Sequence, residues 1–256
     1  MKNLSLLVLF FCTFNYSFAQ VEFPKLNATW CYTASGDFGE PLYNVCFSPD
    51  SLIEINDLEY SRVIGLDYIY DTIYYREENR KLYIYLPNSY NEKPDEYYPV
   101  LYMFDGQNVF FDSDATYGKS WGLKEYLEYT NTQMIVVAPA CNQNPDNGRL
   151  KEYTPYPFKD KTFGNIKSLG KITMEWFVNE LKPTIDNTFR TRSDRNNTFI
   201  AGSSMGGLMS LYAILEYNHI FSRAAALSPS IWTGPQKLAK MIKNANINPD
   251  TVVYMD

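Results

Sequence analysis

The sequence predicts an α/β fold, in which a mainly parallel sheet carries helices on both of its faces. Short apolar runs alternate with helical patterns from Leu82 to the end of the chain. Strands that alternate with helices pair in parallel through right-handed crossovers. A glycine-rich turn from Gly202 to Gly206 also joins one apolar run directly to a long apolar helical segment. We therefore expect functional groups on the loops that follow the strands, at the carboxyl edge of the sheet.

Short apolar runs are predicted as strands and longer apolar segments as helices, because buried strands need fewer residues than helices do. The predicted strands, in chain order, are residues 82–86, 100–104, 134–138, 198–202, 223–227 and 251–255. The predicted helices are residues 122–129, 172–186, 205–217 and 235–245. The glycine-rich turn falls between the strand at 198–202 and the helix that follows it.

The first residues have the features of a signal peptide. Lys2 precedes an apolar stretch at residues 4–11, and Ser17-Phe18-Ala19 presents small residues where cleavage before Gln20 is expected. This stretch is shorter than the roughly 20 apolar residues that span a bilayer. We expect residues 1–19 to be removed, and the mature protein to be secreted or periplasmic with no membrane anchor.

Residues 20–78 are predicted to form a small β-rich segment before the α/β domain. Gly36-Asp37 is a turn signal, and Ile53-Glu54-Ile55 alternates as a half-buried strand does. The many aromatic residues of this segment either pack together or stack on a sugar, and packing is the commoner role on strands. The segment is loosely similar to N-terminal regions of secreted proteins from Bacteroidetes-type bacteria, chiefly at residues 74–83.

The sequence Gly202-Ser203-Ser204-Met205-Gly206 predicts a nucleophile elbow, because a strand precedes it and a helix follows it. Gly202 and Gly206 lack a Cβ atom and so let the helix pack closely behind a strained turn. Ser204 is then the nucleophile, and the backbone N–H of Met205 is one oxyanion donor. The alternative is an ordinary glycine-rich turn with a serine that faces solvent.

The sequence offers no base for this serine. Its one histidine, His219, follows Ser204 by fifteen residues. Along a helix that rises about 1.5 Å per residue the two lie roughly 20 Å apart, whereas proton transfer needs contact at about 3 Å. Asp256, after the last predicted strand, is a weak candidate for the catalytic acid, because a terminal residue frays and no histidine is there to be oriented.

Four stretches carry a resemblance to a known family: residues 82–90, 98–108, 201–207 and 221–230. They resemble the putative esterase family of α/β-hydrolases, which includes esterase D, enterochelin esterase and the mycolyltransferases. The resemblance implies that Ser204 is the nucleophile and that the backbone N–H groups of Gln107 and Met205 form the oxyanion hole. It also implies an acid and a histidine further along. We expect the domain at residues 79–256 to be incomplete and to lack its last strand or strands.

Composition argues against several other classes of function. The net charge of −6 does not suit a nucleic-acid binder, which carries a basic stripe. With one histidine and no CxxC spacing, we expect no metal and no other cofactor. Asp112-Ser113-Asp114 has too few ordered oxygen ligands for calcium and is predicted to be a solvated loop. Cys31, Cys46 and Cys141 remain after signal cleavage, and a Cys31–Cys46 disulfide and free thiols both stay open.

Two functions are compatible with these features. The first is an exported serine carboxylic-ester hydrolase that forms an acyl-enzyme on Ser204 and takes a small-molecule or polysaccharide ester, such as an acetyl, feruloyl or siderophore ester. The second is a catalytically inactive relative that binds a glycan or another protein. The intact elbow and the Asp105-Gly106-Gln107 loop favour the first. The long connection at 142–167 is expected to shape the cleft, with Arg149, Tyr153 and Tyr156 as candidate substrate contacts.

Overall fold

The computed structural model describes residues 51–55, 58–62, 68–75 and 78–256, with side chains from Arg80 onward. The predicted signal peptide at residues 1–19 and the predicted pairing of Cys31 with Cys46 lie outside the described residues. Three strands are described within the β-rich segment predicted at 20–78.

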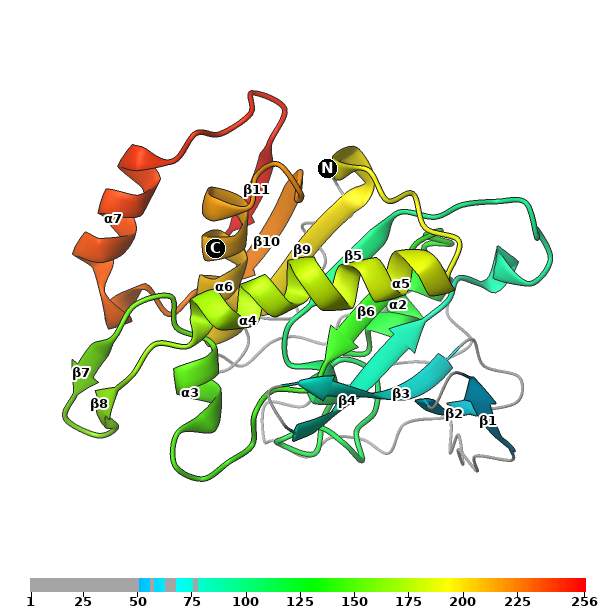
Figure 1. Ribbon diagram of the computed structural model, residues 1–256, viewed down its shortest axis with the longest axis horizontal. Helices are drawn as coiled ribbons and strands as arrows, with labels where there is room; N and C mark the ends of the chain where they lie inside the picture. Colours follow the sequence, from blue (N-terminus) through cyan, green and yellow to red (C-terminus); the bar gives the residue numbers. More distant parts are fainter. Residues whose placement is uncertain (1–50, 56–57, 63–67, 76–77) are drawn as a thin grey trace, which may run out of the picture.

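One sheet of nine strands runs through the described part of the chain, in the order β1-β2-β3-β4-β6-β5-β9-β10-β11 (Figure 1). Its strands are β1 Ser51–Ile55, β2 Leu58–Arg62, β3 Tyr68–Tyr75, β4 Glu78–Tyr85, β5 Val100–Met103, β6 Ile135–Pro139, β9 Thr198–Ser203, β10 Arg223–Leu227 and β11 Val252–Met255. The neighbours from β6 to β11 pair in parallel, whereas β1 to β4 pair antiparallel and β4 is antiparallel to β6. The parallel half of this mixed sheet carries the glycine-rich turn.

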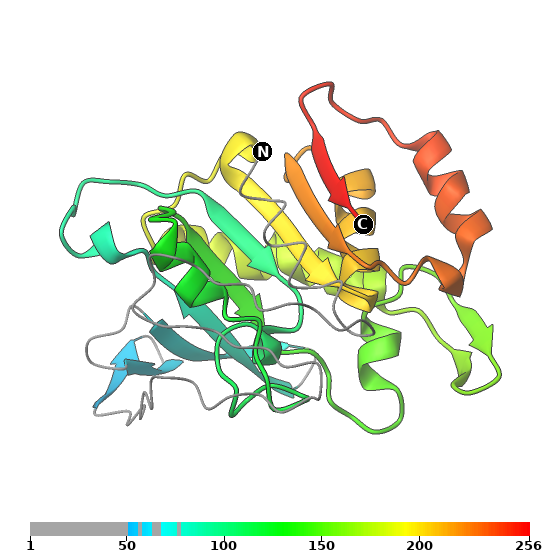
Figure 2. The ribbon, with the colours of Figure 1, turned by 180° about the vertical axis from the view of Figure 1, so that it is seen from behind.

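Helices cover both faces of the sheet, as predicted. They are α2 Leu123–Tyr129, α3 Gly148–Glu152, α4 Gly170–Trp176, the π-helical segment η4 Phe177–Leu181, α5 Lys182–Thr188, α6 Met205–Glu216 and α7 Pro235–Asn244. The segments α4, η4 and α5 follow one another directly and form one rod across the face seen in Figure 1. The opposite face carries α2, which Figure 2 shows from behind.

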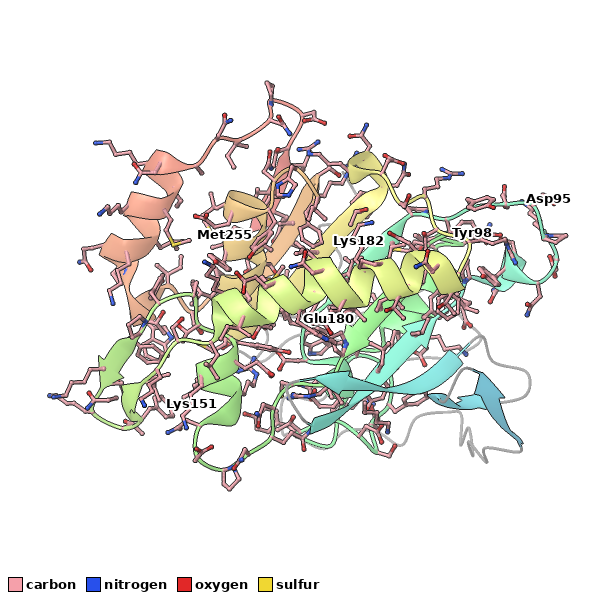
Figure 3. The ribbon with its side chains drawn as sticks, viewed as in Figure 1. Asp95, Tyr98, Lys151, Glu180, Lys182 and Met255 are labelled. Carbon is pink, nitrogen blue, oxygen red and sulfur yellow. The ribbon has the colours of Figure 1, made fainter. Side chains whose placement is uncertain are left out.

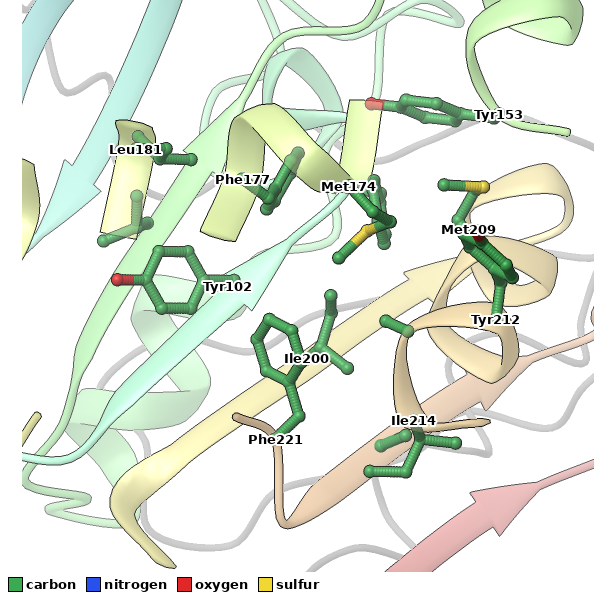
Figure 4. Close-up of a cluster of buried hydrophobic side chains, with 14 of the residues drawn as sticks. Tyr102, Tyr153, Met174, Phe177, Leu181, Ile200, Met209, Tyr212, Ile214 and Phe221 are labelled. Carbon is green, nitrogen blue, oxygen red and sulfur yellow. The ribbon is translucent and has the colours of Figure 1, made fainter. Parts of the chain in front are cut away.

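Two clusters of buried side chains fill the space between these helices and the sheet. Beneath the rod and α6, Phe177 packs on Tyr102 and Phe104, with ring centroids 6.3 and 5.1 Å away (Figure 4). On the other face, Leu123 and Leu127 of α2 close a smaller cluster. The central strands are thus covered on both sides, which is why they are continuous apolar runs in the sequence.

The predicted strands correspond to β4, β5, β6, β9, β10 and β11, and the predicted helices to α2, the rod, α6 and α7. The connection at 142–167 differs from its prediction as one long loop. It holds α3 and an antiparallel hairpin of β7 Phe158–Asp160 and β8 Gly164–Ile166. Elements of three to five residues are too short to show a period, so the sequence pattern did not reveal them.

The last strand in the described order, β11, pairs only along one side. Val252, Val253 and Met255 on this strand are 46%, 46% and 53% exposed, so apolar side chains of both faces meet solvent there. Across the described ranges, no helix is both long enough and apolar enough to cross a membrane.

Candidate active site

Ser204 lies at the corner between β9 and α6, where the sequence predicts an elbow. Its backbone has φ 58° and ψ −115°, a conformation that residues with a side chain rarely adopt. The corner is held from both sides: the N–H of Ser204 donates to the carbonyl oxygen of Leu227 at 2.8 Å, and its own carbonyl accepts from the N–H of Ser230 at 2.9 Å. The side chain of Ser204 is exposed. The turn therefore presents the hydroxyl outward, as the prediction requires.

The two glycines of the turn are needed because the strand and the helix approach too closely for a side chain. A Cβ atom at Gly202 would lie 2.6 Å from the carbonyl carbon and oxygen of Gly206. A Cβ atom at Gly206 would lie 3.0 Å from the Cβ of Phe104 and 3.2 Å from a carboxylate oxygen of Asp105. The elbow and the loop that follows β5 are therefore in direct contact.

The hydroxyl of Ser204 has one side-chain partner among the described residues. Its Oγ lies 3.1 Å from the Oγ of Ser230, and either hydroxyl can donate in this pair. Ser230 is itself 4% exposed and precedes the short 3₁₀ helix η6, Ile231–Thr233. Ser230 belongs to the stretch at 221–230 that carries the family resemblance, but its contact with Ser204 has no signal in the sequence.

The residues at 104–108, which we call the 104–108 loop, lie beside the elbow after β5. Asp105 has φ 61° and starts the 3₁₀ helix η3, Gly106–Asn108. Gln107 is the second residue of η3, and Met205 is the first residue of α6. N–H groups in the first turn of a helix have no acceptor within that helix, so both are available to a ligand. These are the two donors that the resemblance implied.

The 104–108 loop is fixed by side chains from the segment after β6. Arg149 makes a two-pronged ion pair with Asp105, from Nε to Oδ1 at 2.6 Å and from Nη2 to Oδ2 at 2.7 Å. The Asp105 carboxylate is 1% exposed, whereas 32% of the Arg149 side chain is exposed. On the other side, Gln107 and Cys141 exchange two hydrogen bonds, at 3.2 and 3.1 Å.

The three candidate substrate contacts on the 142–167 connection have different environments. Arg149 is partly exposed at the elbow, where its Nη2 also lies 3.4 Å from the carbonyl oxygen of Ser203. Tyr153 is 2% exposed, and its hydroxyl accepts from the backbone N–H of Asp105 at 3.2 Å. Burial raises the pKa of Tyr153 well above its usual value. Tyr156 is 7% exposed. Both tyrosines are therefore buried, and Tyr153 contacts the 104–108 loop.

His219 lies far from Ser204, whereas Asp256 lies at the carboxyl edge of the sheet. His219 lies beyond the far end of α6, whose twelve residues span about 18 Å from Ser204. Its ring contacts that of Tyr217, with centroids 6.4 Å apart. Asp256 follows β11 at the carboxyl edge of the sheet, and its carboxylate accepts from the backbone N–H of Ser228. The expected separation of His219 from the serine is confirmed, and the acid position has no imidazole beside it among the described residues.

An aromatic group that the sequence did not reveal lies next to Ser230. Trp232 in η6 is 54% exposed and packs edge-on against Phe158 of β7, with ring centroids 5.6 Å apart. Phe163, in the turn of the β7–β8 hairpin, lies 6.4 Å from the same indole and is 39% exposed. Trp232 and Phe163 are distant in sequence but together form an exposed aromatic surface. Trp232 follows Ser230 by two residues.

The acidic loop at 112–114 has partners within the protein. Asp112 accepts from Lys119 Nζ at 2.8 Å and from the N–H of Ser120 at 2.7 Å, and Asp114 accepts from Lys81 and Tyr83, both at 2.6 Å. Among the residues whose placement is described, no three His, Cys, Asp or Glu side chains gather as metal ligands would. The carboxylates of this loop are therefore engaged in ion pairs and hydrogen bonds.

The chain is similar to known proteins in sequence and in fold. The family model described as "Putative esterase" matches residues 75–249. The chain is 28% identical over 181 residues to the uncharacterized protein YbbA of Bacillus subtilis, covering 69% of this chain and 67% of YbbA. It is 31% identical over 153 residues to an endo-1,4-beta-xylanase/feruloyl esterase of Xylanibacter ruminicola, covering 57% of this chain and 19% of that longer protein.

Among solved structures, the BES protein of Bacillus cereus shares the fold, with a TM-score of 0.59 and 20% identity over 80% of this chain and 78% of that one. The mixed sheet with helices on both faces is therefore an α/β-hydrolase-like fold. Because the family model spans well over half of the sequence, the chain belongs to the putative esterase family.

Proposed function

We propose that this protein is an exported serine carboxylic-ester hydrolase that acts through an acyl-enzyme on Ser204. The observation that carries the proposal is the exposed hydroxyl of Ser204 on a strained turn. Met205 directly follows this turn, and its Gly206 packs against the 104–108 loop, which contains Gln107. A turn of this kind is costly to the fold and persists where it serves a function. A glycan-binding or protein-binding role gives no reason for it.

The proposed reaction has two steps. The Oγ of Ser204 attacks the ester carbonyl carbon, its proton passes to a base, and the carbonyl oxygen becomes an oxyanion that accepts hydrogen bonds from Gln107 and Met205. The carbon–oxygen bond to the leaving group then breaks, and the leaving oxygen takes up a proton to depart as an alcohol. Water attacks the acyl-enzyme in the same way and releases the acid. The elbow glycines, Gly202 and Gly206, allow the close packing that the turn needs.

The base is the missing component. His219 lies beyond the far end of α6 from Ser204, and no other histidine occurs in the sequence. Removing the base from a serine hydrolase leaves the contributions of the oxyanion hole and of binding. We therefore infer that these 256 residues acylate slowly at Ser204, and that an imidazole supplied in solution accelerates the step.

We further propose that the substrate carries an aromatic group, either on the acyl side or in the alcohol. Trp232 and Phe163 offer exposed rings close to the elbow, and aromatic rings stack with ligands of their own kind. The similarity to a protein named as a feruloyl esterase supports an aromatic acyl group, on a small molecule or on a polysaccharide.

Export and domain organisation complete the proposal. Residues 1–19 are proposed as the signal peptide, 20–78 as a β-rich segment and 79–256 as the esterase domain. N-terminal sequencing of the protein recovered from the periplasm or medium of an expressing bacterium tests this, with Gln20 expected as the first residue. A cytoplasmic protein that begins at Met1 contradicts it.

Acylation by p-nitrophenyl acetate tests the catalytic role. Nitrophenol release is followed with and without added imidazole, and the acyl group is located by mass spectrometry. We expect acetyl on Ser204, formed faster as imidazole is added, and no such modification in Ser204→Ala, which also gives the rate of the reaction in solution. Ser193→Ala, at an exposed serine that precedes β9 and so lies toward the opposite end of that strand from the elbow, is the control and should behave as wild type. A wild-type protein that stays unmodified on Ser204 under all conditions contradicts the proposal and favours the catalytically inactive binding protein.

A further inference from the structure

The 104–108 loop is short and lies against the ends of two strands. Phe104 donates its N–H to the carbonyl oxygen of Ala201 at 2.9 Å, and a Cβ atom at Gly106 would clash with the carbonyl oxygen of Ala138. Asp105 is held at φ 61° between these contacts. Because a non-glycine residue in the left-handed region is disfavoured, surrounding contacts must hold it there.

The first of these contacts is the ion pair between Asp105 and Arg149. Both carboxylate oxygens are engaged, by Nε and by Nη2, in the fork geometry that only arginine provides. The same Nη2 reaches the carbonyl oxygen of Ser203, the residue before the nucleophile. Arg149 therefore ties the 104–108 loop to the end of β9.

The second contact is the pair of hydrogen bonds between Gln107 and Cys141. The Gln107 amide nitrogen donates to the sulfur at 3.2 Å, and the Cys141 backbone N–H donates to the amide oxygen at 3.1 Å. Gln107 is 3% exposed and Cys141 is 6% exposed. The side chain of Gln107 thus points away from solvent into the protein, which fixes the direction of its backbone N–H.

We propose that Arg149 and Cys141 are positioning residues, which act through Asp105 and Gln107 to aim the backbone N–H of Gln107 at the oxyanion. The proposal rests on the proposed function, since it assigns a role to the oxyanion hole of that reaction. Neither residue touches the reacting atoms. Their two contacts fix both ends of the Asp105-Gly106-Gln107 sequence, so that the N–H needs no rearrangement when charge develops.

Loss of Arg149 is expected to move the loop. An unpaired carboxylate as buried as that of Asp105 is strongly disfavoured, and its movement toward water breaks the arrangement around it. The Gln107–Cys141 hydrogen bonds then open as well, because Gln107 is part of the loop that moves. Burial raises the pKa of the Cys141 thiol to about 12, so thiolate is scarce and alkylation is slow while the loop is closed. Alkylation of Cys141 therefore reports on the loop without reference to catalysis.

The experiment compares Arg149→Gln with the double variant Asp105→Asn/Arg149→Gln and with Lys151→Gln. Lys151 is on the same helix, α3, and pairs with Asp146 at the surface, so its variant is the matched control (Figure 3). In Arg149→Gln we expect imidazole-assisted acylation of Ser204 to slow by 10- to 100-fold at saturating ester, and iodoacetamide to modify Cys141 at least 10-fold faster. The double variant removes the unpaired charge, so its thermal midpoint should recover while its acylation stays slow.

A smaller effect is expected at the second contact. Cys141→Ser keeps a hydroxyl for Gln107 and should acylate within about threefold of wild type, whereas Cys141→Ala should be slower by about 10-fold. Equal acylation rates in wild type and in a folded double variant would overturn the positioning role. If wild-type Ser204 is never acylated, the proposed function fails, and cysteine alkylation still decides whether Arg149 holds the loop: equal modification of Cys141 in Arg149→Gln and Lys151→Gln overturns that as well.

Discussion

The hydroxyl oxygen of Ser204 lies 3.1 Å from the hydroxyl oxygen of Ser230, and the backbone N–H of Ser230 also bonds the Ser204 carbonyl. In the resting protein, the proposed nucleophile is thus paired with a second, buried serine. A hydroxyl that is already hydrogen-bonded is stabilised before the reaction, and attack must weaken that bond.

Ser230→Ala should therefore speed acylation of Ser204. A neutral hydrogen bond contributes about 0.5–1.5 kcal/mol, which corresponds to a two- to tenfold higher rate with an unchanged half-saturating ester concentration. Single-turnover release of nitrophenol in the presence of imidazole measures it. Ser193→Ala serves again as the control, and a slower Ser230→Ala would show that this hydroxyl assists the attack.

Gly202→Ala should destabilise the protein by about 1–3 kcal/mol, because its Cβ atom would lie 2.6 Å from backbone atoms of Gly206 that cannot move independently. Gly206→Ala should have a smaller effect, since its nearest neighbours at 3.0 and 3.2 Å are side-chain atoms of Phe104 and Asp105. Urea unfolding followed by circular dichroism ranks the two. The reverse order would contradict the close packing described for the elbow.

Trp232→Ala should weaken binding of ferulic acid about three- to tenfold, the effect of losing one aromatic contact. Isothermal titration calorimetry measures the dissociation constant directly and requires no turnover. Tyr97→Ala is a matched control, because Tyr97 is also 54% exposed but precedes β5, at the opposite edge of the sheet from the elbow. Equal weakening in both variants would remove Trp232 from the proposed substrate surface.

Acid should remove the stabilisation that Asp112 supplies. Burial acts to raise the pKa of Asp112, but hydrogen bonds from Lys119 and Ser120 outweigh it and leave that pKa below its ordinary value of 3.8. A lowered pKa in the folded state contributes stability that is fully present above the unfolded value and is lost as pH falls through the folded one.

The difference in thermal midpoint between wild type and Asp112→Asn should accordingly stay constant from about pH 7 to pH 5 and narrow below about pH 4. Asp95→Asn, at an exposed carboxylate (Figure 3), is the control and should give no difference at any of these pH values. A midpoint difference that persists unchanged to pH 2 would show that the carboxylate is not the source of the stability.

The sequence was informative where burial and turn chemistry act locally. Strands β5, β6 and β9 were predictable because both of their faces are buried, and the elbow was predictable because its glycines and serine are adjacent in sequence. The pairing of Asp105 with Arg149 was not, since the two are 44 residues apart and no pattern says which acid meets which base. The same holds for Trp232 and Phe163, which approach only through the fold.

The sequence pattern also did not predict that β4 runs antiparallel to β6. Its register with β6 pairs Leu82 with Pro139 and Tyr85 with Val136, and a run of apolar residues has the same pattern in either direction. The π-helical turn at Phe177–Leu181 likewise left no period of its own, because five residues inside a longer helix change the spacing only once.

The backbone at Ser204 has a consequence for how this chain can evolve. Glycine reaches φ 58° more readily than serine does, so selection for folding alone would favour glycine at this position. Selection for a more stable fold and selection to keep the hydroxyl therefore favour different residues at position 204. A lineage that no longer uses the hydroxyl should replace this serine early, before its core residues change.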